Sequence, residues 1–148
     1  MSTAVMDLCV AIADALLLAP AIAGGQVYVG QAVPLPEGQS EGVAVRPLRA
    51  VGQQPFAGDD RTDWSVDVGV SCIARSDVAT TGFAALDTLL SDVYARLAQA
   101  AAVPGTDGWL VQPGLAYSFD EADSTIAQAD IRLTVRLRTA AGTLAADT

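Results

Sequence analysis

The side chains best suited to catalysis are scarce in this sequence, and the few present stand apart from one another. The chain of 148 residues contains no His and no Lys, so the commonest general base and the amine nucleophile are both absent. The two cysteines, Cys9 and Cys72, have apolar neighbours, and only Arg75 is near enough in sequence to favour a thiolate at Cys72. We therefore predict that the protein is not an enzyme. We expect two buried free thiols, with a disulfide between them as the alternative.

An acidic group at Asp59, Asp60 and Asp63 has the residue types of a cation site but not the spacing. An EF-hand loop needs ligands at alternate positions and a terminal Glu, and neither is present here. The segment G-Q-V-Y-V-G at 25–30 lacks the glycine pattern and the helix junction of a phosphate-binding loop. We therefore predict a solvated acidic loop, and a protein that holds no metal and no cofactor.

The basic residues form the other notable group, because all eight are Arg. A GC-rich coding sequence explains this composition most simply, whereas a functional explanation is bidentate pairing across an interface, which Lys achieves less well. Three of them, Arg132, Arg136 and Arg138, alternate with apolar residues and so share one face of a predicted strand. This stripe is interpreted either as a solvated sheet face or as a subunit interface that meets Asp67 and other acidic side chains.

Two strands and two helices carry the predicted fold. Strict alternation over residues 126–139 predicts the central strand, and residues 64–75 alternate in the same way. Apolar residues at helical spacing predict helices over 3–19 and 81–102, the second with Phe83, Leu86, Leu89, Leu90, Val93 and Leu97 buried. Shorter strands are expected at 27–29, 43–51 and 109–119. The order predicts an α+β fold, with a mixed or antiparallel sheet and both main helices packed on one face.

The segment 31–63 is predicted to be an irregular arm or loop within one domain that spans 1–148. Pro47 cannot donate to a sheet, so the strand at 43–51 is expected at an edge, or bulged at Pro47. Phe56 and Trp64 lie at the margins of the loop 52–63, which also contains Arg61. The two aromatics either pack back onto the core or anchor a partner. In the second helix, Asp92 and Arg96 are spaced for an i, i+4 pair.

Composition restricts the possible partners. The formal net charge is −9, which argues against general affinity for nucleic acid and for anionic membranes. Apolar residues make up 51% of the chain, as in a globular protein with a real core. The apolar run near the N-terminus has no preceding basic residue and is interrupted by Asp7 and Asp14, so we expect an intracellular protein without a signal peptide.

The order and texture of these segments resemble the tail terminator, or tail-completion, proteins of long-tailed bacteriophages. The resemblance rests on the first helix, on the irregular segment 31–63, on D-W-S-V-D-V-G-V-S-C-I-A-R at 63–75, on F-A-A-L-D-T-L-L-S-D-V-Y-A-R-L at 83–97, and on the closing run from Gly114 to Leu137. It implies a subunit that forms a ring, typically a hexamer, in the virion tail after assembly in the host cytoplasm. Such a ring caps the tail tube and offers a surface to the head–tail connector, and DNA passes through it without specific binding.

Nine residues are the candidates for the subunit or tube interface: Arg132, Arg136, Arg138, Asp67, Phe56, Asp59, Asp60, Arg61 and Trp64. Two alternatives to the tail terminator remain open from sequence. One is another neck or head–tail joining protein, or a minor tail protein; the other is a small binding module unrelated to phages. An acidic wall suits a channel that DNA must traverse, because it repels phosphates.

Overall fold

The structure is a computed structural model, and it describes residues 3–18, 20–30, 39–54, 58, 60–76, 82–99, 114–119, 126–140 and 142–145. Two α-helices, one short 3-10 helix and five strands follow one another in these ranges. They are α1 (Ala4–Leu17), η1 (Ile22–Gly25), β1 (Val27–Val29), β2 (Glu41–Gln53), β3 (Thr62–Arg75), α2 (Gly82–Gln99), β4 (Gly114–Phe119) and β5 (Ile126–Thr139).

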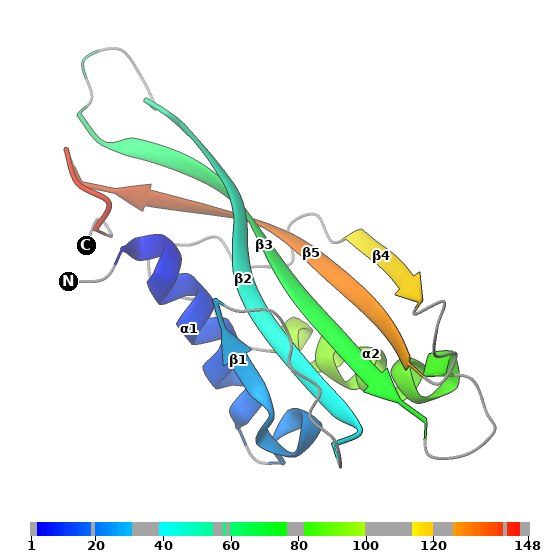
Figure 1. The fold of residues 1–148 in the computed structure, drawn as a ribbon. Coiled ribbons are helices and arrows are strands. Elements are labelled where there is room, and N and C mark those ends of the chain that lie inside the picture. The colour runs from blue at the N-terminus through cyan, green and yellow to red at the C-terminus, as the bar shows by residue number, and fades with distance from the viewer. Residues whose placement is uncertain are drawn as a thin grey trace.

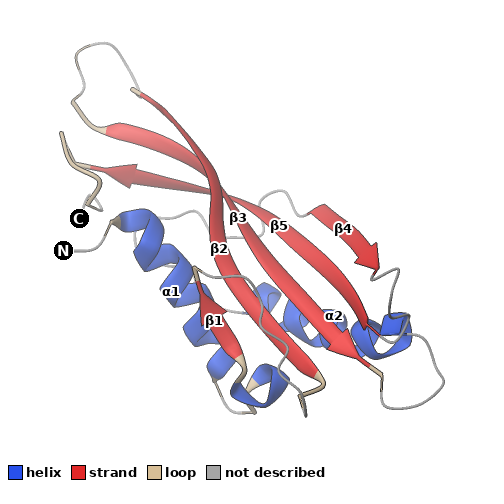
Figure 2. Cartoon of the chain, viewed as in Figure 1, coloured by secondary structure: helices blue, strands red, loops and turns tan. Residues whose placement is uncertain are grey.

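The five strands form one mixed sheet in the order β1-β2-β3-β5-β4 (Figure 1). β1 is parallel to β2, while the β2–β3, β3–β5 and β4–β5 pairs are antiparallel. Helices α1 and α2 contact each other and share one hydrophobic core with a single face of the sheet (Figure 2). The predicted α+β fold with both helices on one face is therefore confirmed.

The core is built on the β3–β5 pair, whose register runs without interruption from Thr62↔Thr139 to Arg75↔Ile126. Every second residue of each strand points to the helices, as the alternation predicted. The fully buried members are Val66, Val68, Val70, Cys72, Ala74, Ala129, Ile131, Leu133 and Val135. Leu8, Ile12 and Leu16 of α1 pack on this face together with Leu86, Val93 and Leu97 of α2.

The prediction that Phe83 belongs to the buried stripe of α2 is wrong. The Phe83 side chain is 44% exposed, and its ring lies 5.9 Å from the ring of Tyr117 on β4, measured between centroids. Phe83 stands in the first turn of the helix, so it packs against the edge strand of the sheet instead of its centre. The tail of the predicted helix, 100–102, and the start of the predicted strand, 109–113, lie outside the described residues.

The two ends of α1 are held differently. At its start, Thr3 is the N-cap, and its Oγ1 accepts a hydrogen bond from the backbone N–H of Met6 at 3.2 Å. The last turn of α1 contains no basic residue. Arg96 of α2 supplies the cation instead: its guanidinium donates to the carbonyl oxygens of Ala15, Leu18 and Pro20, at 3.1, 2.8 and 2.7 Å. The predicted Asp92–Arg96 pair is not found among the described contacts.

The segment 31–63 is more regular than expected, because Glu41–Gln53 form the long strand β2. The predicted bulge is confirmed, since the β2–β3 register shifts between Pro47 and Arg49. The first part of β2 is not at an edge, because Val43 to Val45 pair with β1 on the side away from β3. The predicted loop 52–63 is also shorter, since Gly52 and Gln53 belong to β2 and Thr62 and Asp63 to β3.

The strands are much longer than the helices that cover them. Fourteen residues span about 46 Å in a strand but only about 21 Å in a helix. β3 and β5 have 14 residues each, as does α1, so each strand is longer than that helix. Figure 1 shows β2, β3 and the end of β5 running on past α1. Val66, Val135 and Leu137 are still buried on the helix side of this part, whereas β2 is exposed from Pro47 to Gln53. We call this half of the sheet, residues 46–53, 62–69 and 132–139, the distal sheet.

Candidate subunit interface

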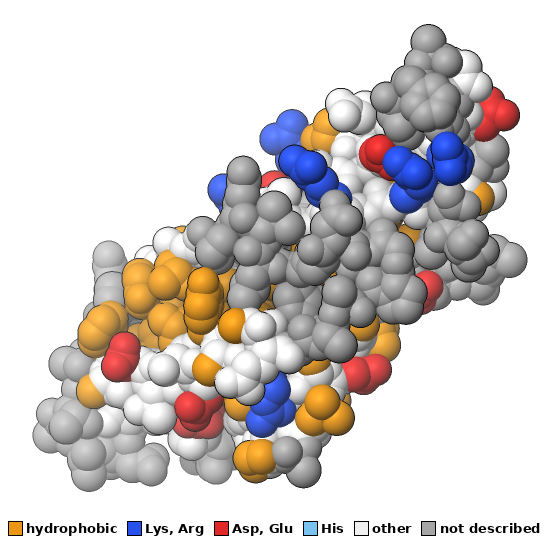
Figure 3. Space-filling view, turned by 180° about the vertical axis from the view of Figure 1, so that it is seen from behind, with side chains coloured by type: hydrophobic (Ala, Val, Ile, Leu, Met, Phe, Trp, Pro, Cys, Tyr) orange, Lys and Arg blue, Asp and Glu red, His pale blue; other side chains and the backbone are white. Residues whose placement is uncertain are grey.

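Six of the eight arginines belong to the distal sheet or adjoin it, and only Arg75 and Arg96 do not. Most of the basic side chains visible in Figure 3 accordingly lie over the half of the molecule that carries the β2–β3 hairpin. The six are Arg46, Arg49, Arg61, Arg132, Arg136 and Arg138. A chain with a net charge of −9 thus concentrates its positive charge at one end.

The sheet register places five of these arginines on the face opposite the helices. Arg46 and Arg132 both stand opposite Gly69, Arg49 stands opposite Asp67, and Arg136 stands opposite Ser65. Cross-strand neighbours of this kind have Cβ atoms about 4.5–5.5 Å apart on the same face. We call this surface, with Arg46, Arg49, Arg132, Arg136 and Arg138, the arginine face.

Arg138 is the member with a firm partner within the subunit. Its Nε and Nη2 donate to the two carboxylate oxygens of Asp63 at 2.6 and 3.1 Å, which is a bidentate pair. The side chains are 39% and 37% exposed, so solvent screens this pair. Asp63 lies directly opposite Arg138 in the register, which explains the pairing.

Arg132 and Arg136 are exposed, and neither has a hydrogen bond or an ion pair with another residue in the described part of the chain. Asp67, the acidic residue expected to meet the stripe, instead accepts a hydrogen bond from Thr134 Oγ1 at 2.8 Å. Arg46 is half-buried, and its Nε is shielded from solvent without an acceptor. The arginine face therefore keeps donors that the described residues of one subunit do not satisfy.

The candidate interface residues in and beside the loop 52–63 differ in how deeply they are buried. Trp64 is half-buried on the helix side of the sheet, and its Nε1–H donates to Thr139 Oγ1 at 2.9 Å. Its ring lies over Gly52, where an added Cβ would come within 2.9 Å of the ring. Trp64 therefore packs back onto its own subunit. Asp60 is exposed and Arg61 is half-buried, while Phe56 and Asp59 lie outside the described residues.

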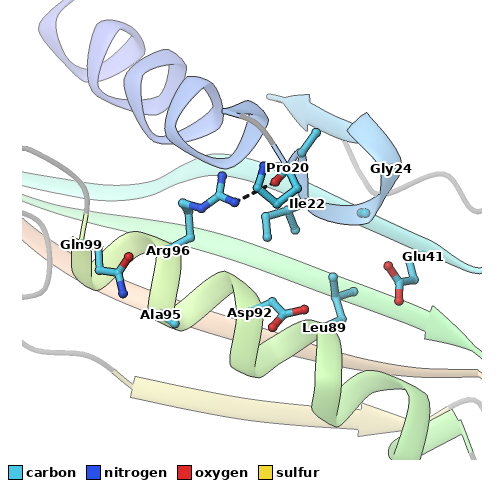
Figure 4. A pocket seen from close by; sticks show the side chains of 11 residues that line it. Pro20, Ile22, Gly24, Glu41, Leu89, Asp92, Ala95, Arg96 and Gln99 are labelled. Atoms are coloured by element: carbon cyan, nitrogen blue, oxygen red, sulfur yellow. Dashed lines mark hydrogen bonds between the residues drawn. The ribbon is translucent and has the colours of Figure 1, made fainter.

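A pocket of about 430 Å³ opens on the helix side at the other end of the sheet, a feature that the sequence did not predict. Glu41 at the start of β2 and Asp92 on α2 both line it, with Leu89 between them, and Arg96 closes one side (Figure 4). Burial, together with the nearby charge of Asp92, raises the pKa of the Glu41 carboxyl. The guanidinium of Arg96 already donates to carbonyls in and after the last turn of α1.

The two thiols lie in the hydrophobic core. Burial raises the pKa of Cys9 to about 11 and that of Cys72 to about 12, so neither thiolate forms at neutral pH. Both cysteines are free and buried, as predicted. Within the described ranges, no three His, Cys, Asp or Glu side chains are grouped as metal ligands. No helix in those ranges is long and apolar enough to span a membrane.

Comparison with known proteins places the fold. No protein-family model matches the chain, and no curated protein matches it. Among solved structures, 22 chains match. One belongs to a structure described as the virion of a native gene transfer agent (GTA) particle. It is 19% identical to this chain, and the alignment covers 93% of this chain and 100% of that one, with a TM-score of 0.66. At this identity the similarity establishes a shared fold.

Proposed function

We propose that this protein is a structural subunit of a phage-like particle, and that within the particle it is the tail terminator. The observation that carries the proposal is the fold shared over 93% of this chain with a complete chain of a GTA virion. The sequence resemblance to tail terminators supports the narrower role. In that role a ring, which we expect to be a hexamer, caps the tail tube and offers a surface to the head connector.

The shape of the subunit suits assembly with other subunits better than a function as a monomer. A ring made of heterologous contacts needs two different and complementary surfaces on each subunit. The distal sheet runs on past α1 and carries Arg132 and Arg136, which have no partner among the described residues, so it can meet a neighbour without unfolding any part of the core. We therefore assign the arginine stripe, Arg132, Arg136 and Arg138, to an interface with another subunit or with the tube protein.

The charge of the chain also suits a conduit for DNA. With 17 acidic residues against eight arginines, a ring of subunits repels phosphates overall. DNA can then pass through the ring without being held. The finished ring belongs to the virion tail, and the subunits assemble in the host cytoplasm.

Removing the gene from a strain that produces the particle tests this function. Electron microscopy should show tails of uncontrolled length that lack attached heads, and the intact gene supplied in trans should restore both properties. Tails of normal length without heads would instead indicate a head–tail joining protein, the closest alternative among neck components. Particles of normal length with normal heads would refute a structural role in the tail.

The purified protein provides a second test. Native mass spectrometry over a range of protein concentrations should detect a closed oligomer, and negative-stain images should show a ring. When this ring is added to polymerising tube protein of the same particle, tube growth should stop. A protein that remains monomeric at every concentration and leaves tube growth unchanged would refute the tail-terminator assignment.

A further inference from the structure

We propose that the arginine face of one subunit docks on the acidic pocket at Glu41 and Asp92 of the next copy of this chain. This inference rests on the proposed ring and names the two surfaces that would close it. It commits to one occupant of the arginine face, a second copy of the chain, and to one contact between copies.

The two surfaces cannot neutralise each other within one subunit. Val51 of β2 and Arg136 of β5 both stand opposite Ser65 of β3, so they lie at the same level of the sheet. Glu41 stands opposite Ala74, and it is ten residues from Val51 along β2. Ten residues of strand span about 33 Å, several times the screening length of about 8 Å in physiological salt. The register also places Glu41 on the helix side of the sheet and Arg136 on the opposite face. Complementary charges on opposite faces and at opposite ends favour contact between copies.

Each surface lacks a partner that the other can supply. Arg132 and Arg136 present guanidinium groups that bind no other described residue. Glu41 and Asp92 are two carboxylates in one pocket, and no described hydrogen bond or ion pair neutralises either of them. Arg96, the cation among the residues that line this pocket, already donates to three carbonyls in and after the last turn of α1. A guanidinium from a neighbour would bind such a pair of carboxylates as a bidentate donor.

The contact is heterologous, because the arginine face and the acidic pocket are different surfaces. Such a contact, repeated, generates a ring when the rotation between subunits closes. A nucleic acid is the other polyanion that an arginine face attracts. A second copy of the chain is the favoured occupant of the arginine face, since every subunit carries the complementary acidic pocket.

Charge reversal on each surface tests the contact. One variant carries Arg132→Glu and Arg136→Glu, and the other carries Asp92→Arg. Each should remain folded by circular dichroism but lose the ring in native mass spectrometry, at concentrations where the parent protein is assembled. Arg75→Glu and Asp87→Arg are the controls, because each reverses one charge of the same sign outside the two surfaces, on β3 and on α2. Both controls should form the parental ring.

Mixing the two reversed variants decides whether the surfaces meet each other. The Asp92→Arg subunit keeps its arginine face, and the double variant keeps its pocket, so an equimolar mixture restores one unaltered contact. Heterodimers, which have a distinct mass, should therefore form although neither variant associates alone. A mixture that stays monomeric would overturn the inference, as would an Asp92→Arg ring of parental stability.

The outcomes separate this inference from the proposed function. If the parent forms a ring that either reversed variant also forms, the pairing is wrong and the tail-terminator assignment stands. If the double variant keeps its ring but no longer retards a short DNA duplex that the parent retards, the occupant of the arginine face is nucleic acid, and the inference is overturned. If the parent forms no oligomer and does not stop tube growth, both proposals fail.

Discussion

Arg96 should stabilise the subunit by joining its two helices. The last four carbonyls of a helix have no partner within the helix, and a cation there is favoured by the helix dipole. The last turn of α1 provides no cation of its own, and Arg96 of α2 binds three carbonyls at that end. Arg96→Ala therefore removes a link between residues far apart in the sequence.

The loss of stability in Arg96→Ala follows from the number of lost hydrogen bonds and from their exposure to solvent. A hydrogen bond to a charged group contributes about 1.5–3 kcal/mol when well shielded, and a cation at a helix C-terminus about 0.3–1 kcal/mol. Two of the three bonds are exposed to solvent, so the total is far below three full contributions. We expect Arg96→Ala to lower the free energy of unfolding by about 2 kcal/mol. For a chain of this length that corresponds to a fall in Tm of about 4–8 °C.

Urea denaturation measures this loss directly, provided that the protein is dilute enough to be a single species. The midpoint should fall by about 1 M with an unchanged slope. Arg96→Lys keeps the charge but loses the planar fork, so it should lose about half as much. Arg132→Ala is the matched control, an exposed arginine for which about 0.5 kcal/mol is the upper limit. If Arg96→Ala behaves like this control, the three carbonyl contacts do not stabilise the fold.

Three further predictions concern the core, the distal sheet and the thiols. Leu133→Ala and Leu90→Ala should each cost about 2–5 kcal/mol, with Leu133, the fully buried residue, at the upper end; calorimetric Tm values of the parental level would contradict this. Gly52→Ala should cost about 1–3 kcal/mol, because the new Cβ meets the Trp64 ring at 2.9 Å; unchanged stability and Trp fluorescence would show that the ring moves freely. The raised pKa values of Cys9 and Cys72 keep both thiols protonated in the folded state, whereas the unfolded chain ionises above its ordinary value of about 8.5. Stability should therefore fall as pH rises from about 8.5 towards 11, and Cys72→Ala should reduce that slope; a parental slope in this variant would refute the linkage.

The sequence predicted which face of each long strand is buried, but it did not predict which residues meet across strands. Alternation determines which side chains of a strand point to each face of the sheet. A shift of two or four residues in the register between strands leaves those faces unchanged. The prediction named Asp67, with other acidic side chains, as a partner of the arginine stripe. The register places Asp63 opposite Arg138 and Thr134 opposite Asp67, so alternation predicted the face of these acidic residues but not their partners within the subunit.

Prediction from sequence also fails where local and distant partners compete for the same side chain. The i, i+4 spacing predicted an Asp92–Arg96 pair, which contributes only about 0.3–0.5 kcal/mol on an exposed helix. Three carbonyls in and after the last turn of α1 offer Arg96 stronger stabilisation, but their position depends on how α1 packs on α2. The same packing releases Asp92 towards Glu41 and creates the pocket, so the candidate acceptor surface depends on contacts that no local pattern records.

The edges of the distal sheet disfavour association between copies by the addition of strands. Beyond Val45, β2 has no partner on the side away from β3, and β5 has none beyond Arg132, within the described part of the chain. Open edges of this kind invite uncontrolled pairing between copies. Pro47 and the adjoining bulge interrupt the β2 edge, and arginines on both edge strands would stand side by side if two copies joined β5 to β2. Repulsion at these edges therefore disfavours uncontrolled strand pairing and leaves the side chains of the face for the proposed contact.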